Sequence, residues 1–202
     1  MIAIIDYGVG NLFSLKSSFK SIGVETVVTG DPEIIEKAEK LVLPGVGAFG
    51  DASKKLKESG LSEVIKKEVK KGKPLLGVCL GMQMLFEKSF EYGEHEGLGL
   101  LKGQVVAFDL DKKYKIPHIG WNFLKFEKIS PLLKYVKEGE CVYFVHSYHA
   151  VNCEDSLLAT SEYGILVTAL VGKGNVYGCQ FHPEKSGEVG LKILKAFTEI
   201  GD

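Results

Sequence analysis

The 202-residue chain contains no arginine, so all 25 of its basic residues are lysines. Arginine supplies the planar, bidentate group with which proteins often hold phosphate. The formal net charge is only −1, so no overall positive field attracts a polyanion. We therefore expect no nucleic-acid partner. A phosphate-rich substrate, if there is one, should be held mainly by another protein.

Cysteine is scarce, and long apolar runs are missing. The cysteines Cys79, Cys141, Cys153 and Cys179 include no CxxC pair and no metal-type Cys/His spacing, so we predict no metal site. The apolar runs are only strand-sized, which excludes a membrane span, and "MIAIIDYG" lacks the features of a signal peptide. We expect a cytoplasmic protein with free thiols, apart from any membrane.

Complete nucleotide-binding motifs are also missing. Gly8 and Gly10 match only the start of GxGxxG, because position 13 is Phe13. No Walker A pattern occurs either. We therefore expect no bound cofactor.

The apolar pattern predicts a single α/β domain over residues 1–202. Strands are expected at 2–5, 24–28, 41–43 and 74–78, alternating with helices at 12–22, 52–71 and 80–87. This alternation is typical of a mostly parallel sheet with helices on both faces. After residue 90, short apolar segments with polar turns predict an antiparallel extension and hairpins. A last helix is expected over roughly 188–200.

The stretch "GVCLG" places one thiol, Cys79, between two glycines where a strand should turn into a helix. This G-x-nucleophile-x-G pattern is typical of a nucleophile elbow. The elbow holds the side chain out at the carboxyl ends of the strands, where open α/β sheets bind ligands. The following helix should favour the thiolate, and the amide of Leu80 should donate to an oxyanion. A buried structural thiol is the alternative.

"FHPEKS" supplies a possible base for this thiol. His182 follows an expected strand, so it should lie at the same sheet edge, and Glu184 is close enough to orient its ring. Together with Cys79 they can form a Cys-His-Glu triad. Taken alone, His182 would more simply be a structural histidine.

The loop "LPGVGAFGD" follows the third expected strand, which should lie beside the Cys79 strand. An amide from Val46 or Gly47 could complete an oxyanion hole with Leu80, because glycines permit close approach and reorientation of a peptide. Gln83, one helical turn after Cys79, could line an acyl pocket. Without the elbow, this loop would be an ordinary glycine-rich connection.

These motifs resemble class I glutamine amidotransferases, and the similarity extends over essentially the whole chain. "GVCLGMQ" and "FHPE" are similar to that family's nucleophile and triad motifs. A finer resemblance, to the glutaminase subunits of imidazole glycerol phosphate synthases, rests on "DYGVGN", "PGVGAFG", "PHIGWN", "YFVHSY" and "FHPEKS". The fold that this resemblance implies is flavodoxin-like.

The resemblance implies an activity and a partner. Glutamine would be hydrolysed through a thioester on Cys79, and the ammonia would pass to a (β/α)8-barrel cyclase subunit in histidine biosynthesis. The absence of arginine fits this implication, because the phosphorylated substrate would bind to the cyclase.

The resemblance also implies residue roles. The glutamine pocket would contain Gly47, Gln83, Glu91, His146, Ser147 and Tyr148. The face toward the cyclase would include Asn11, His118, Trp121, Asn122, Tyr143 and Lys185. Without the resemblance, Trp121 and Tyr143 would more simply belong to the core.

The sequence also bears on two other classes of function. A stand-alone cysteine hydrolase or peptidase on a related scaffold often has a different histidine context, and the HPE spacing argues against it. A non-catalytic module usually lacks the nucleophile or the histidine, and this chain has both.

Overall fold

A computed structural model describes residues 1–201. Its main feature is an eight-stranded sheet in the order β2-β1-β3-β4-β14-β13-β12-β9. The first five strands run parallel, and the last three are antiparallel to their neighbours. Their bounds are β1 Ile2–Ile5, β2 Thr26–Thr29, β3 Lys40–Leu43, β4 Leu75–Val78, β9 Lys125–Phe126, β12 Leu157–Glu162, β13 Leu166–Lys173 and β14 Val176–Cys179. The expected parallel sheet with an antiparallel extension is therefore confirmed.

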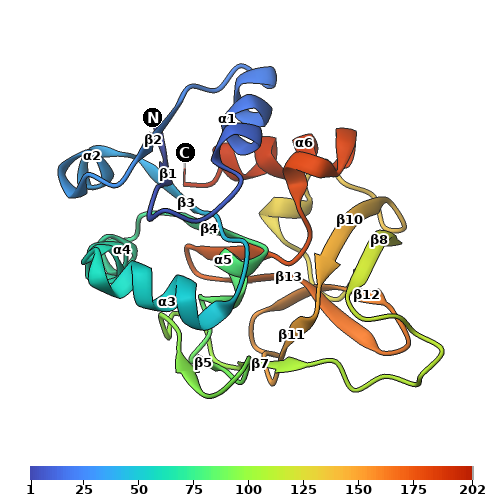
Figure 1. The fold of residues 1–202 in the computed structure, drawn as a ribbon. Coiled ribbons are helices and arrows are strands. Elements are labelled where there is room, and N and C mark those ends of the chain that lie inside the picture. The colour runs from blue at the N-terminus through green and yellow to red at the C-terminus, as the bar shows by residue number, and fades with distance from the viewer. Residues whose placement is uncertain (202) are drawn as a thin grey trace.

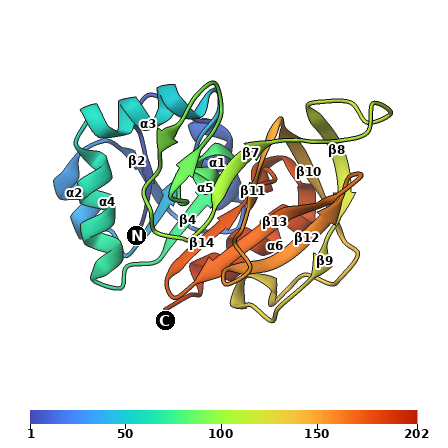
Figure 2. The same cartoon turned by 90° about the horizontal axis from the view of Figure 1, so that it is seen from below.

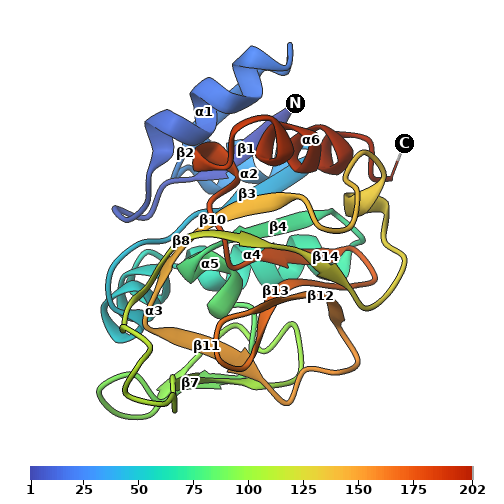
Figure 3. The same cartoon turned by 90° about the vertical axis from the view of Figure 1, so that its right-hand side faces the viewer.

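Helices cover both faces of this sheet (Figures 1 and 3). One face carries α1 and α6, and the other carries α3, α4 and α5. Side chains alternate accordingly in β1, where Ile2 and Ile4 join one buried cluster and Ala3 and Ile5 join the other. The helices are α1 Leu12–Ser21, α2 Pro32–Lys37, α3 Phe49–Glu58, α4 Leu61–Lys70, α5 Leu80–Gln83 and α6 Gly187–Thr198, with short 3-10 turns η1 Pro131–Leu133 and η2 Pro183–Lys185. Within residues 1–201, none of the helices has the length and apolar character to cross a membrane.

Two helix predictions were wrong, and one helix was not predicted. The helix expected over 52–71 is two helices, because Gly60 adopts a left-handed φ of 74° between α3 and α4. The helix expected over 80–87 ends at Gln83 after a single turn. The short α2 was missed, although Asp31 caps it and Pro32 begins it, which is a usual sequence signal for a helix start.

Two smaller sheets complete the fold. One apolar segment breaks at Ser147 into β10 Cys141–His146 and β11 Tyr148–Val151. Strand β10 pairs with β8 His118–Phe123, whereas β11 joins β7 Gln104–Ala107, β5 Lys88–Ser89 and β6 His95–Glu96. Figure 2 shows β8 and β10 at the opposite end of the molecule from α2 and α4. The break at Ser147 turns the chain over the end of β4, where Cys79 lies.

Candidate active site

Cys79 lies on a strained turn between β4 and α5. Its φ is 54°, one of three positive φ values among the non-glycine residues of the described chain. The flanking glycines are sterically required. A Cβ on Gly77 would lie 2.7 Å from the carbonyl oxygen of Gly81, and one on Gly81 would lie 1.9 Å from that of Leu43. The turn therefore has the geometry of a nucleophile elbow, with strain concentrated at the residue that carries the thiol.

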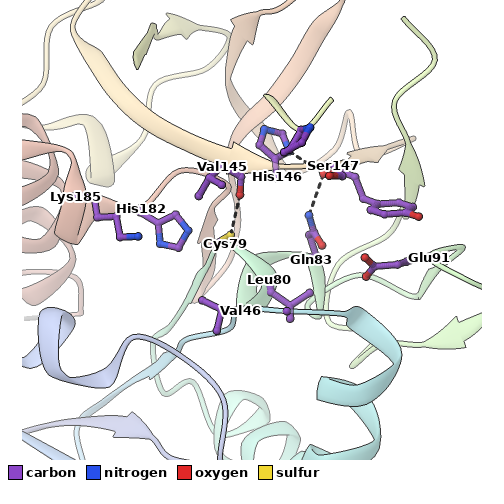
Figure 4. A pocket seen from close by; sticks show the side chains of 13 residues that line it. Val46, Cys79, Leu80, Gln83, Glu91, Val145, His146, Ser147, His182 and Lys185 are labelled. Carbon is purple, nitrogen blue, oxygen red and sulfur yellow. Dashed lines mark hydrogen bonds between the residues drawn. The ribbon is translucent and has the colours of Figure 1, made fainter. Parts of the chain in front are cut away.

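His182 lies beside Cys79 (Figure 4). Its Nδ1 is 2.8 Å from Oε1 of Glu184, and both side chains are almost completely buried. Burial lowers the pKa of His182, but hydrogen bonds to Cys79 and Glu184 and the charges of both outweigh burial and raise this pKa to about 10. The three side chains thus form a connected chain in which an imidazolium is favoured between two acidic groups.

A cavity of about 320 Å³ opens over these residues. It is large enough for a small polar molecule, and it collects side chains from segments far apart in the sequence. Most of the predicted site lines it, together with Pro117 and Val145: Val46, Gly47, Cys79, Leu80, Gln83, Glu91, His146, Ser147, Tyr148, His182 and Lys185. Glu184 lies behind His182, on the side away from this cavity.

The glycine-rich loop borders the cavity beside Leu80. Gly47 has a φ of 89°, and a Cβ added there would meet nothing within 4 Å. The loop begins at Pro44, whose carbonyl accepts a 2.8 Å hydrogen bond from the buried Tyr7 hydroxyl. Leu80 is the first residue of α5, so its amide has no acceptor within that helix. One end of the loop is thus fixed, and the peptide at Gly47 has steric freedom.

Gln83 has a more constrained role than expected. Its Nε2 donates to the carbonyl of Tyr148 at 3.0 Å and to Oε1 of Gln180 at 2.9 Å. Both amide hydrogens are therefore used within the protein. Only the oxygen of this amide is left to face a ligand.

A chain of neutral histidines adjoins the cavity. His118 Nδ1 lies 3.0 Å from His146 Nε2, and His146 Nδ1 lies 2.8 Å from the carbonyl of Tyr148. Burial lowers the pKa of His118 to about 4 and is the largest cause that lowers the pKa of His146 to about 3. Burial also lowers the pKa of His149. All three are neutral near pH 7 and add no charge, and His118 and His146 provide hydrogen bonds.

Glu91 links the cavity to α3. Its Oε2 accepts a 2.5 Å hydrogen bond from the amide of Phe49, the first residue of that helix. The residue before the helix, Ala48, has no side chain that could do this. The carboxylate of Glu91 thus caps α3 and at the same time borders the cavity.

The residues predicted to face a partner fall into two groups. Trp121, which is 55% exposed, packs edge-on against Tyr143 with ring centroids 6.0 Å apart, and Asn11 and Lys185 also reach the surface. His118 is different, because it is 1% exposed and is held between Asn122 and His146. In this structure His118 therefore lies behind the exposed face and does not form part of it.

Sequence reasoning missed three residues. Ile119 and Phe123 are 56% and 66% exposed and alternate with Trp121 along β8, so the outer side of this strand is an apolar stripe. The two-residue alternation of "HIGWNF" was the available signal. Gln180 is completely buried and donates from Nε2 toward Cys79 Sγ at 3.8 Å. Its position two residues before His182 was the only signal in the sequence.

Two known proteins are similar to this chain over nearly its whole length. A protein from Caldanaerobacter subterraneus subsp. tengcongensis, named Imidazole glycerol phosphate synthase subunit HisH, is 55% identical over 201 residues, 99% of this chain and 98% of its own. A protein of the same name from Lactococcus lactis subsp. lactis is 53% identical over 199 residues, 98% of each chain.

Solved structures show the same fold at low sequence identity. One described as a glutamine amidotransferase has a TM-score of 0.76 at 22% identity and covers 98% of this chain and 100% of its own. PurLQS from Thermotoga maritima has a TM-score of 0.74 at 22% identity, with 98% and 96% covered. The family model for Glutamine amidotransferase class-I matches residues 3–200. The chain therefore belongs to the class-I glutamine amidotransferase family.

Proposed function

We propose that this chain is the glutaminase subunit of an imidazole glycerol phosphate synthase, acting as one glutamine amidotransferase domain over residues 1–202. The observation that carries the proposal is the buried connection from Cys79 through His182 to Glu184 beneath a cavity of about 320 Å³. The two relatives that share more than half of the sequence carry the name of this subunit.

Glutamine would bind with its side-chain amide over Cys79. The thiolate attacks the amide carbon, and the carbonyl oxygen becomes an oxyanion that accepts from the amides of Leu80 and of Val46 or Gly47. His182 gives its proton to the leaving nitrogen, so ammonia departs and a glutamyl thioester remains. Water, deprotonated by His182, then attacks the thioester and releases glutamate, which restores the thiolate–imidazolium pair.

The rest of the pocket would hold the amino-acid end of glutamine. The carboxylate of Glu91 suits the α-ammonium group, while Ser147 and Tyr148 offer backbone and side-chain groups at the turn between β10 and β11. Neutral His146 lines the same cavity without adding charge, because burial lowers its pKa. Gln83 contributes its amide oxygen, since both of its hydrogens are already donated.

The partner would be the cyclase subunit, to which the ammonia passes without reaching solvent. The apolar stripe of Ile119, Trp121 and Phe123 is the surface best suited to it, with Tyr143 and Lys185 alongside. Aromatic side chains on an exposed strand are typical of the centre of a protein interface. We place the complex in the cytoplasm, where the four free thiols of this chain stay reduced.

The test is glutamate release from glutamine by the purified chain, alone and with the cyclase subunit and its nucleotide ligand. The proposal predicts low activity alone, strong stimulation in the mixture, and none with Cys79→Ala. Full activity from the isolated chain would indicate an uncoupled hydrolase instead. Inactivity of every mixture, with the fold intact, would contradict the proposed partner.

A further inference from the structure

Gln180 occupies an unusual position for an uncharged amide. It lies between the end of β14 and His182, is completely buried, and directs its side chain toward two residues of the site. Its Oε1 accepts from Gln83 Nε2 at 2.9 Å, and its Nε2 donates toward Cys79 Sγ at 3.8 Å. The hydrolysis described above assigns it no step.

The orientation of the Gln180 amide can be assigned from the carbonyl of Tyr148, which can only accept hydrogen bonds. The carbonyl of Tyr148 lies 3.0 Å from one end of the Gln83 amide, so that end must be the NH₂ group. The same NH₂ group also faces Gln180, which must therefore present its oxygen to Gln83. The other end of the Gln180 amide, which faces the sulfur, is then NH₂ as well.

We propose that Gln180 is a fixed N–H donor to the Cys79 sulfur, which favours the thiolate and holds it in its attacking position. This inference rests on the proposed role of Cys79 as nucleophile, and it adds a second side-chain donor to the sulfur beside His182. A hydrogen bond from an amide stabilises a thiolate more than a thiol, because the anion is the stronger acceptor. Burial keeps water from taking the place of the amide.

Other titratable groups also lie around the sulfur. His182 hydrogen-bonds to Cys79, and Tyr7 and Cys179 interact with it electrostatically. Glu184 acts through His182, and Glu91, His146 and Lys185 line the same cavity. Because Cys79 and His182 titrate as a pair, the pH midpoint of Cys79 alkylation belongs to the pair. Substitution of Gln180 leaves all of these groups in place.

The test is the rate of Cys79 alkylation by iodoacetamide as a function of pH, on the full chain, with mass spectrometry of the Cys79 peptide. Gln180→Leu removes the donor, and Gln180→Glu keeps the shape while facing the sulfur with an oxygen. We expect the midpoint to rise by about one pH unit in Gln180→Leu and by more in Gln180→Glu. The matched control is Gln104→Leu, which removes an amide side chain from β7, outside the cavity. This variant should leave the pH midpoint of Cys79 alkylation unchanged.

Circular dichroism shows whether each variant is folded. If Gln180→Leu does not fold, the nearly isosteric Gln180→Glu decides the question. Wild-type midpoints in the folded Gln180 variants, or an equal shift in Gln104→Leu, would overturn the proposal. Alkylation needs no glutamine, so it reports on this donor even if glutamate release, the test of the proposed function, fails.

Discussion

His118 and His146 share a buried hydrogen bond of 3.0 Å between Nδ1 and Nε2, and its direction can be assigned. Asn122 Nδ2 lies 3.2 Å from the carbonyl of Glu162, so this atom is a donor, and it donates to His118 Nε2 at 2.9 Å. His118 must then carry its proton on Nδ1 and donate to His146. His146 in turn donates from Nδ1 to the carbonyl of Tyr148. One directed chain thus runs from the strand that carries Trp121 to the rim of the cavity.

Removing the ring nitrogens of His118 should destabilise the fold. His118→Phe keeps the stacking on Tyr163 and Phe144, at 4.0 Å and 4.8 Å, but leaves His146 Nε2 buried without a donor. We expect the free energy of unfolding in urea to fall by about 1–3 kcal/mol. The matched control is His149→Phe, because His149 stacks on Phe108 and its Nδ1 has no partner. The control should cost less than about 0.5 kcal/mol. Equal losses of unfolding free energy in the two variants would contradict the directed hydrogen-bond chain.

The same histidines contribute to the loss of stability at acid pH. The pKa values of His118 and His146 are lowered to about 4 and about 3 from an ordinary 6.5, so the unfolded chain takes up protons first as the pH falls. Their contribution to stability is complete above pH 6.5 and is lost as the pH falls through 4 toward 3. Urea unfolding at pH 7, 6, 5 and 4 should give a steadily decreasing free energy. A constant free energy of unfolding from pH 7 to 4 would contradict the claim that His118 and His146 are buried in their neutral form.

His182 acts in the opposite direction. Its pKa is raised to about 10, so its contribution is complete below pH 6.5 and is lost as the pH rises from there toward 10. We expect NMR titration of the His182 ring to give a lower midpoint in Cys79→Ala than in the unsubstituted chain, because the variant lacks the Cys79 hydrogen bond and charge that raise this pKa. Equal midpoints in the two proteins would mean that Cys79 and His182 are not coupled.

Two substitutions of Glu91 should separate its two roles. Glu91→Gln keeps an oxygen for the Phe49 amide and loses the charge, so we expect unchanged stability and a KM for glutamine at least tenfold higher. Glu91→Ala loses both, and unfolding should also become easier by about 0.5–2 kcal/mol. Calorimetry and steady-state kinetics with the cyclase present measure the two effects. An unchanged KM in both variants would remove Glu91 from the glutamine pocket.

The loop peptide at Gly47 can be tested without introducing a clash. Gly47→Ala adds a methyl group into open space, so its effect comes from the positive φ of 89° alone. Gly47→Pro also removes the N–H and cannot adopt that φ. We expect reduced glutamate release in the first variant and none in the second, with Cys79 alkylated normally in both. Turnover by Gly47→Pro would exclude the loop as the source of the oxyanion hole.

The sequence was sufficient for the parallel strands and for the elbow, because both depend on local patterns. Short apolar runs such as "IAII" and "LVL", bounded by polar or turn residues, are typical of covered strands. The glycines on either side of Cys79 match the spacing that a nucleophile elbow requires. The division of the helix at Gly60 and the end of α5 at Gln83 were missed. At Gly60 a left-handed glycine overrides the continuous apolar pattern. The end of α5 has no such local cause, because Met84 keeps right-handed helical angles after Gln83.

The connections made by buried polar groups could not be predicted. Gln180 reaches Cys79 and Gln83 only because β14 lies beside β4 in the sheet, with residues about 100 positions apart. His118 meets His146 because β8 pairs with β10 in one register, in which the two residues are directly opposite. Neither register is encoded near the residues concerned. Such contacts follow from topology rather than from local periodicity.

The most direct test of the account is to trap the glutamyl thioester on Cys79. The complex with the cyclase subunit and its ligand is mixed with isotopically labelled glutamine, quenched in acid and digested, and the peptides are analysed by mass spectrometry. The account predicts label on the Cys79 peptide, and more of it in His182→Asn if deacylation is slowed further than acylation. Glutamate release at the normal rate with no label on Cys79, or with label on Cys141 or Cys153 instead, would contradict it.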